Sequence, residues 1–351
     1  MTSKRDRILG SLIGAAIGDA MGSVTEARTT QAILQRHGGY VREIRRPPYD
    51  TFSRINWKGA VTDDFSMVYL IAKAFIEKNG VVTPELFEDV LIEWFDLPQY
   101  SIQSGPNSRD RIKKLRGEPY NTSRDHLAAR HDLVTNGTAM KSSPIGMINP
   151  GNLDRAIEET IIMCMPTHPT ALGISGGAAI SCAVAEAMAG SATKESVIDA
   201  GLYGAAKGYE RSKSRAVPSS GARIERRIHM AVEIAVKHGK DFEKLLYEMA
   251  SVVGTGYSCA ESPAAVFGLF LAAKDPLEFL IMSTNVGGDT DTLATMGGAI
   301  FGAFSGAAAF EPDFQRLIEE NNYSDPKNTV HFDLDWIADG LARIIDERNA
   351  K

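Results

Sequence analysis

The stretch Asn285-Val-Gly-Gly-Asp289-Thr-Asp291-Thr292 places two carboxylates and two hydroxyls within four residues, directly after a pair of glycines. The glycines allow the backbone to turn sharply before the acidic residues. From Leu293 to Ala309 the chain continues with small residues every three or four positions, a spacing that predicts a closely packed, buried helix. Asp and Thr are preferred N-cap residues, so we expect the acidic group at the N-terminus of this helix.

This acidic group has two interpretations. One aspartate caps the helix and the other side chains are solvated, or the group binds a metal ion. A cap requires only one side chain, whereas the segment offers four oxygen donors. Oxygen ligands at this density suit Mg²⁺ or Mn²⁺ rather than zinc.

A second acidic cluster, Thr62-Asp63-Asp64, precedes the apolar segment that begins at Met67. The helix dipole eases the repulsion between adjacent carboxylates at a helix start. A cation that bridges the carboxylates makes the arrangement strongly favourable. The repetition of this pattern therefore favours a metal site built from two helix starts.

Glycines repeat every four residues in the first predicted helix, residues 5 to 22, at positions 10, 14, 18 and 22. Each glycine lowers helix propensity by nearly 1 kcal/mol, so the stripe requires a reason, and close approach of another helix is the simplest. Asp19 and Glu26 lie just beyond this stripe. By itself, Glu26 is interpreted as a surface carboxylate in a turn.

Helical periodicity dominates the rest of the chain, and no sustained period-2 alternation or internal repeat is present. The fold class expected is therefore all-α, with one compact multi-helix domain that spans residues 1–351. Residues 27–61 are expected to be irregular. Residues 99–133 are expected to form either a mobile loop near the substrate or an inert insertion. Further helices are predicted at 83–95, 154–165, 171–190, 195–211, 222–238 and 241–252 and from 261.

Composition limits the class of protein. The 351 residues are 44% hydrophobic and 23% charged, as in ordinary globular proteins. A net charge of −6 without a basic block argues against a nucleic-acid partner, and no apolar run is long enough to predict a membrane span. Cys164, Cys182 and Cys259 are not in metal-ligand spacing, so we predict buried free thiols and a cytoplasmic location. The sequence does not predict an oligomeric state.

With both acidic clusters in view, the sequence resembles the ADP-ribosylglycohydrolase family, which includes the dinitrogenase reductase-activating glycohydrolases. The matching motifs are Gly18-Asp-Ala-Met-Gly-Ser-Val-Thr-Glu26, Thr62-Asp-Asp64, Asn136-Gly-Thr-Ala-Met140, Thr167-His168 and Gly287-Gly-Asp-Thr-Asp-Thr292. The resemblance implies an all-α domain that holds two divalent cations in a central cleft. Members of the family hydrolyse N- or O-glycosidic bonds of ADP-ribose.

The resemblance also implies roles for individual residues. It implies two Mg²⁺ or Mn²⁺ ions, with Asp291 bridging both, and metal ligands at Glu26, Thr62, Asp63, Asp64, Asp289, Asp291 and Thr292. Of these, Asp63, Asp64 or Glu26 would accept a proton from the attacking water. Substrate-binding residues are expected at Asn136, Gly137, His168, Gly287 and Gly288, although a lone histidine such as His168 is more often a hydrogen-bonded core residue.

The sequence departs from the family pattern at three places. Phe65 stands where many members have threonine, and Lys141 replaces a frequent arginine. The segment His131-Asp-Leu-Val-Thr135 replaces a loop with glycine and an aromatic residue, whose backbone N–H groups cradle a diphosphate.

Three functions therefore remain. The first is a metal-dependent hydrolase that cleaves at C1 of ribose and releases ADP-ribose from an ADP-ribosylated protein side chain or small molecule. The second is a hydrolase of smaller N-ribosyl compounds such as nucleosides, motivated by the altered segment. The third is a catalytically inactive descendant with a ligand-binding or structural role.

Overall fold

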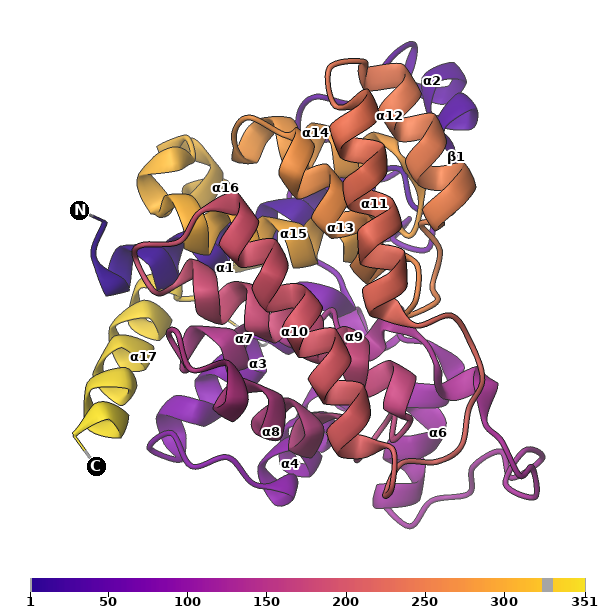
Figure 1. Cartoon of the computed structure of the whole chain (residues 1–351), viewed down its shortest axis with the longest axis vertical. Helices are drawn as coiled ribbons and strands as arrows, with labels where there is room; N and C mark the ends of the chain where they lie inside the picture. The colour runs from indigo at the N-terminus through magenta and orange to yellow at the C-terminus, as the bar shows by residue number, and fades with distance from the viewer. Residues whose placement is uncertain (1, 324–330, 351) are drawn as a thin grey trace.

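Helices make up nearly all of the regular structure in this computed structural model, which describes residues 2–323 and 331–350 (Figure 1). Two short strands, β1 (Arg28–Thr29) and β2 (Gly287–Gly288), pair antiparallel. The all-α prediction is confirmed. The helices are α1 (Lys4–Gly22), α2 (Thr30–His37), α3 (Asp63–Glu77), α4 (Pro84–Phe95), α5 (Pro98–Ser101), α6 (Pro106–Leu115), α7 (Ser143–Met147), α8 (Leu153–Cys164), α9 (Ala171–Ala187), α10 (Lys194–Ser212), α11 (Ile224–His238), α12 (Phe242–Glu248), α13 (Ser262–Ala272), α14 (Pro276–Asn285), α15 (Thr290–Ser305), α16 (Pro312–Tyr323) and α17 (Leu334–Asn349).

The glycine stripe of α1 packs directly on α15. A Cβ atom added at Gly14 would lie 2.1 Å from the carbonyl oxygen of Gly298, a separation that no side chain tolerates. The hydroxyl of Ser11 donates to the carbonyl of Ala299 at 2.8 Å across the same contact. The predicted close helix approach is therefore confirmed. The two helices run antiparallel, so the C-terminal end of α1 lies beside the N-terminal end of α15.

The second acidic cluster begins α3 as its sequence predicts. Thr62 adopts an extended backbone, and its hydroxyl accepts the N–H of Asp64. The next residues, from Phe65 to Ala72, are all buried against the core. A polar cap followed by an apolar segment therefore anchors the carboxylates at one end of a rigid helix.

Several elements differ from the expectation of irregular structure. Residues 27–61 contain α2, which begins at the Thr29 cap and ends at Gly38 in a left-handed conformation. Residues 99–133 contain α6, which the sequence conceals because Ile112 is its only buried residue. Residues 312–323 and 334–349, for which no prediction was made, also form helices. α2 and α6 each bury a single residue, so their hydrophobic periodicity is weak, whereas α17 buries Leu334, Ile337, Ala338, Leu341, Ile344 and Ile345 at helical spacing.

The predictions for the cysteines are confirmed, since all three side chains are buried free thiols. Burial raises the pKa of Cys164 and of Cys259 to about 12. None of the described helices combines the length and apolar character that crossing a membrane requires.

Candidate metal centre

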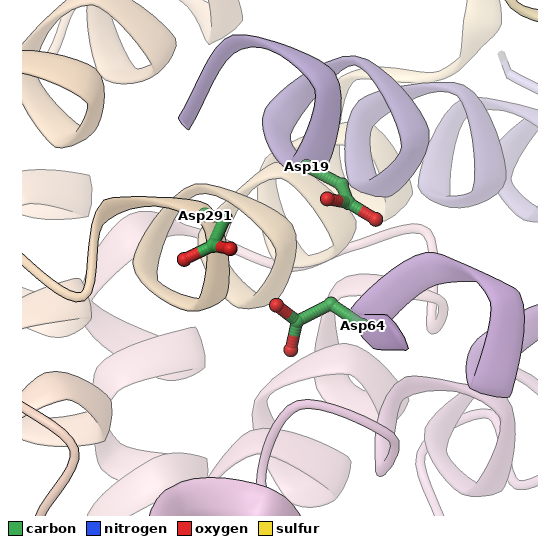
Figure 2. A group of neighbouring side chains, drawn as sticks. All are labelled: Asp19, Asp64 and Asp291. Atoms are coloured by element: carbon green, nitrogen blue, oxygen red, sulfur yellow. The ribbon is translucent and has the colours of Figure 1, made fainter. Parts of the chain in front are cut away.

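Two groups of three carboxylates lie where α1, α3 and α15 meet. Asp19, Asp64 and Asp291 form one group, and Figure 2 shows that these side chains come from three different helices. Glu26, Asp289 and Asp291 form the other. Within each group, oxygen atoms lie within 4.8 Å of one another, and every member is buried. Asp291 belongs to both groups, as expected for a residue that bridges two ions.

Asp19 occupies a position that the sequence-based ligand set omits. Its Oδ2 atom accepts the backbone N–H groups of Thr62 at 2.8 Å and Phe65 at 2.9 Å. Its Oδ1 atom is buried and has no hydrogen-bond partner among the described residues. Asp19 therefore holds the start of α3 with one oxygen and leaves the other for a cation. In the sequence, the sign of this role is that Asp19 is the one charged residue in the run from Ile8 to Met21.

Glu26 reaches the centre because the backbone turns sharply after it. Ala27 has a φ of +59° and its N–H donates to the carbonyl of Gly288 at 2.9 Å, which begins the β1–β2 pairing. This ladder ties the Glu26 segment to the two glycines before Asp289. Glu26 is 7% exposed, so the interpretation of Glu26 as a surface carboxylate is wrong.

The side chain of Asp289 does not cap α15. No cap hydrogen bond is made by this residue although it occupies the N-cap position. Its carboxylate instead accepts a hydrogen bond from the Nδ2 atom of Asn136. In the first turn of α15, the hydroxyl of Thr292 donates to both carboxylate oxygens of Asp64, on the neighbouring helix α3, at 3.2 and 3.1 Å. The carboxylates of this acidic group are therefore held by hydrogen bonds at the cavity, and they do not serve as a simple helix cap.

The nearby Arg109 charge compensates this centre only in part, by opposing the rise in the pKa of Asp63. No ion pair within 4.0 Å joins any of these carboxylates to a described Lys, Arg or His side chain. Burial raises the pKa of Asp19, Asp63 and Asp291 to about 7, and burial with the nearby Asp291 charge raises that of Glu26 to about 11. Clustered carboxylates are stabilised either by protons or by cations. The hard oxygen donors and the orphaned Asp19 oxygen therefore fit two divalent cations.

The carboxylates open into a cavity of about 350 Å³. Of the residues predicted for the site, Thr62, Gly287 and Gly288 are not in its wall. Those that line it are Glu26, Asp63, Asp64, Asn136, Gly137, His168, Asp289, Asp291 and Thr292. Gly287 and Gly288 pair with β1, and a Cβ atom on Gly288 would lie 2.3 Å from the carbonyl oxygen of Thr255. These glycines therefore shape the backbone before Asp289 and do not face the cavity.

Asn136 links the cavity wall to the metal centre. Its Nδ2 atom donates to Asp289 and also to the Ser262 hydroxyl at 2.8 Å. Its backbone N–H donates to the carbonyl of Tyr257 at 3.0 Å. The Tyr257 hydroxyl in turn donates to Glu26 at 3.4 Å. Nothing in the local sequence reveals that Tyr257 lies beside Glu26.

His168 is buried in the cavity wall and is uncharged. Burial, together with the Lys141 and Arg111 charges, lowers its pKa to about 3. Its Nε2 atom lies 2.8 Å from the Thr135 hydroxyl, whereas its Nδ1 atom has no partner among the described residues. A Cβ atom on Gly137 would lie 3.0 Å from the imidazole ring, so a larger residue there would crowd it. A neutral, fixed imidazole suits binding better than proton transfer.

The segment from His131 to Thr135 does not present an anionic wall. Asp132 is paired with Arg130 at 2.8 Å and with Arg124 at 3.3 Å, and it is not among the lining residues. The backbone N–H groups of Leu133 and Val134 donate to the carbonyls of Arg130 and His131. These N–H groups are therefore not available to a phosphate.

Part of the predicted loop, residues 102–109, lines the same cavity as the carboxylates. This segment includes Arg109 at the start of α6, a residue that the site prediction missed. Its charge was one of many in a polar region of the sequence. Only the folded arrangement places it on the cavity.

Comparisons with known proteins agree with this geometry. The sequence profile of the ADP-ribosylglycohydrolase family matches residues 1–350. The chain is 29% identical to the uncharacterized protein YegU of Escherichia coli (strain K12) over 99% of each chain. It is 24% identical to the ADP-ribosylhydrolase ARH3 of Homo sapiens, with 89% of each chain covered. A solved structure, an ADP-ribosylglycohydrolase-related protein complex, shares the fold with a TM-score of 0.67 and 20% identity, covering 98% of this chain and 100% of the other.

Proposed function

Because this chain belongs to the ADP-ribosylglycohydrolase family, a family of ADP-ribosyl hydrolases, we propose that it is a divalent-metal-dependent hydrolase that cleaves at C1 of ribose. The reaction releases ADP-ribose from an ADP-ribosylated side chain or small molecule. The observation that carries this proposal is the pair of buried acidic groups that share Asp291 at the cavity.

Two Mg²⁺ or Mn²⁺ ions are the cofactors of this proposal. Asp19, Asp64 and Asp291 would hold one ion, and Glu26, Asp289 and Asp291 would hold the other. When bound, the ions would supply positive charge that orients the ribose hydroxyls and lowers the pKa of a water molecule. Thr292 keeps the Asp64 carboxylate in position through the hydrogen bonds to both of its oxygens.

Asp63 is the best-placed proton acceptor. It lines the cavity but belongs to neither group of three carboxylates, whereas Asp64 and Glu26 are members of those groups. Its carboxylate can therefore accept the proton of the attacking water without leaving a metal. The surrounding negative charges also favour the positive charge that develops at C1 when the glycosidic bond breaks.

Asn136 and His168 position the substrate in this mechanism. Asn136 is fixed by Asp289 and Ser262, and His168 is fixed by Thr135. Since His168 is neutral, it binds through hydrogen bonds and does not act as an acid.

A nucleoside-like substrate is the second candidate. The observation that favours it is the segment before Asn136, whose N–H groups at Leu133 and Val134 are already used within the protein. Two backbone donors of that segment are therefore not available to cradle a diphosphate. A smaller ribosyl compound does not require them.

The test is hydrolysis by metal-loaded protein of ADP-ribosylated arginine, ADP-ribosylated serine and a set of ribonucleosides. Metal-dependent release of ADP-ribose is expected, together with loss of release in the Asp289→Ala/Asp291→Ala variant. The Glu85→Ala/Asp89→Ala variant, which removes two exposed charges from α4, serves as the matched control and should retain activity. Cleavage of nucleosides alone would favour the second candidate. Tight metal binding without turnover of any substrate would identify an inactive descendant.

A further inference from the structure

Residues 51–56, in the connection between α2 and α3, bury polar side chains and expose apolar ones. Thr51, Ser53 and Asn56 are buried, whereas Phe52 and Ile55 are each 55% exposed. A surface segment ordinarily has the opposite arrangement, with its large apolar side chains turned away from water. This inverted pattern requires a reason.

Hydrogen bonds of the buried side chains hold the segment in this orientation. The Thr51 hydroxyl donates to the carbonyl of Pro48 at 3.0 Å. The side-chain amide of Asn56 donates to the carbonyl of Val61 at 3.3 Å. Because buried polar groups that are paired are costly to expose and separate, the outward direction of the two apolar side chains is a fixed feature of the fold.

A second segment extends the same apolar surface. The Ser53 hydroxyl donates to the side-chain oxygen of Gln103 at 3.0 Å, and the Gln103 amide donates to Asn56 at 3.4 Å. These bonds place Ile102, which is 60% exposed, next to the inverted segment. The apolar rim is the name used here for three residues: Phe52, Ile55 and Ile102.

The apolar rim begins inside the cavity and continues beyond it. Phe52 and Ile102 line the cavity that holds the carboxylates, whereas Ile55 is not among the described residues of its wall. A ribosyl compound held by the carboxylates reaches the first two residues. Covering Ile55 requires a substrate that continues past the cavity mouth, as the polypeptide around a modified side chain does.

The chemistry of the apolar rim also favours a polypeptide. Exposed apolar side chains that lie together mark a surface that another molecule covers. Two of the three residues, Ile55 and Ile102, are aliphatic and offer neither charge nor an aromatic face. Nucleic acid is bound through cations and aromatic stacking, so the natural partner of these side chains is an apolar side chain.

We propose that the apolar rim binds an apolar side chain next to the ADP-ribosylated residue of a polypeptide substrate. This inference rests on the proposed function and deepens it, because it assigns the substrate to modified polypeptides rather than to small molecules. Phe52 and Ile102 contact the residue nearest to the modified side chain, and Ile55 contacts the chain beyond it. The rim determines specificity and takes no part in bond cleavage.

The test measures binding of dye-labelled peptides by fluorescence anisotropy. Mg²⁺-loaded Asp63→Asn protein is used so that the peptides are not hydrolysed. Each peptide carries one ADP-ribosylated arginine or serine, flanked either by leucine or by glutamine. The leucine peptides should bind about tenfold more tightly, because burial of an apolar side chain is favourable.

Phe52→Ser and Ile55→Ser should each reduce this preference about threefold or more, because each removes apolar surface from the rim. Ile55→Ser should leave the affinity for the glutamine peptides unchanged, since Ile55 lies outside the cavity wall. Val236→Ser is the matched control, because it removes an exposed apolar side chain from α11, outside that wall. It should retain the full preference for leucine.

Equal affinity for the leucine and glutamine peptides would overturn the inference. A preference that persists in both Phe52→Ser and Ile55→Ser would also overturn it. Self-association of the wild type that is lost in Ile55→Ser, measured by sedimentation, would assign the rim to a second copy of the chain instead. Binding of an ADP-ribosylated oligonucleotide that depends on Ile55 would assign it to nucleic acid.

The hydrolysis assay separates this inference from the proposed function. If the protein cleaves free ADP-ribosylated arginine or serine but the peptides show no preference for leucine, the inference fails and the function stands. If no ribosyl compound is cleaved but the leucine preference is present and depends on Phe52 and Ile55, the function fails and the docking surface stands.

Discussion

Gly22 in α1 lies directly against the backbone of Asp291 in α15, such that a Cβ atom on Gly22 would come within 2.4 Å of the Asp291 Cα atom. This contact is the last in the glycine stripe and lies beside the carboxylates. Asp19, one turn earlier in α1, therefore meets Asp291 in the same acidic group. The helix contact that builds the core also sets the spacing of the metal centre.

Substitution of Gly22 by alanine is expected to disturb the metal centre. Overpacking in a rigid contact costs about 1–3 kcal/mol of unfolding free energy. The shift of α1 should also weaken metal affinity about tenfold or more, as displaced supporting groups do. Calorimetric titration with Mn²⁺ measures the affinity, and thermal unfolding measures the stability.

Gly10→Ala is the matched control for this experiment. A Cβ atom at Gly10 would lie 2.5 Å from the Gly302 carbonyl oxygen, at the opposite end of the same helix contact. This variant should lose a similar amount of stability and retain metal affinity. Equal metal affinities in the two variants would contradict the link between the stripe and the metal centre.

Asp19→Asn should reduce metal affinity while the metal-free protein remains folded. The amide has the shape of the carboxylate and its oxygen can still accept from Thr62 and Phe65, whose N–H groups Asp19 now binds. It removes one negative charge from a group that is repulsive without cations. We expect metal affinity about tenfold lower or weaker still, together with a metal-free melting temperature that is unchanged or higher. Unchanged metal affinity would exclude Asp19 as a ligand.

The stabilisation given by divalent metal should increase as the pH rises from about 5 to about 8. Burial raises the pKa of Asp19 and Asp291 to about 7, above the value of about 4 expected in the unfolded chain. These carboxyl groups therefore favour the metal-free fold at low pH, and that contribution is lost as the pH rises through about 7. Divalent cations compete with these protons for the carboxylates. The stabilisation that the cations give therefore increases as the pH rises.

Thermal unfolding with and without Mg²⁺ across this pH range tests the prediction. Asp19→Asn should reduce the pH dependence, because one of the titrating groups is gone. A metal-induced increase in melting temperature that is larger at the acidic end would reverse the predicted sign.

Asp63→Asn and Asp64→Asn should separate turnover from metal binding. Asp64 belongs to an acidic group of three and Asp63 does not, although both line the cavity. Asp63→Asn should lower kcat by about a hundredfold or more, as loss of a general base does, and retain metal affinity. Asp64→Asn should instead lower metal affinity, and turnover should fall because the metal is lost. Parallel loss of metal in both variants would show that Asp63 is a ligand instead.

His168 should remain neutral across the physiological pH range. Burial and nearby positive charges lower its pKa to about 3. Its ring ¹⁵N shifts, followed by NMR, should therefore be constant between about pH 5 and about pH 8. A titration of His168 within that range would require a more open or more acidic environment than the structure shows.

The residues of the two acidic clusters share a local signal. Thr62 is a helix cap, Asp63 and Asp64 follow it, and Asp289, Asp291 and Thr292 follow a glycine turn, so the two clusters were recognisable at helix starts. Arg109 and Tyr257 had no such signal. Each is an ordinary residue in a polar segment, and only its neighbours in space give it a place on the cavity.

The sequence by itself determined the all-helical class, the close approach of the glycine-striped helix and the two acidic helix starts, because caps and periodicity act over a few residues. Tertiary structure alone decided that Asp19 joins Asp64 and Asp291, that Glu26 is buried, and that Gly287 and Gly288 face away from the cavity. Those outcomes depend on which helices pack together and in which direction. The antiparallel contact of α1 with α15 joins residues more than 250 positions apart, as the hydroxyl of Ser11 on Ala299 illustrates.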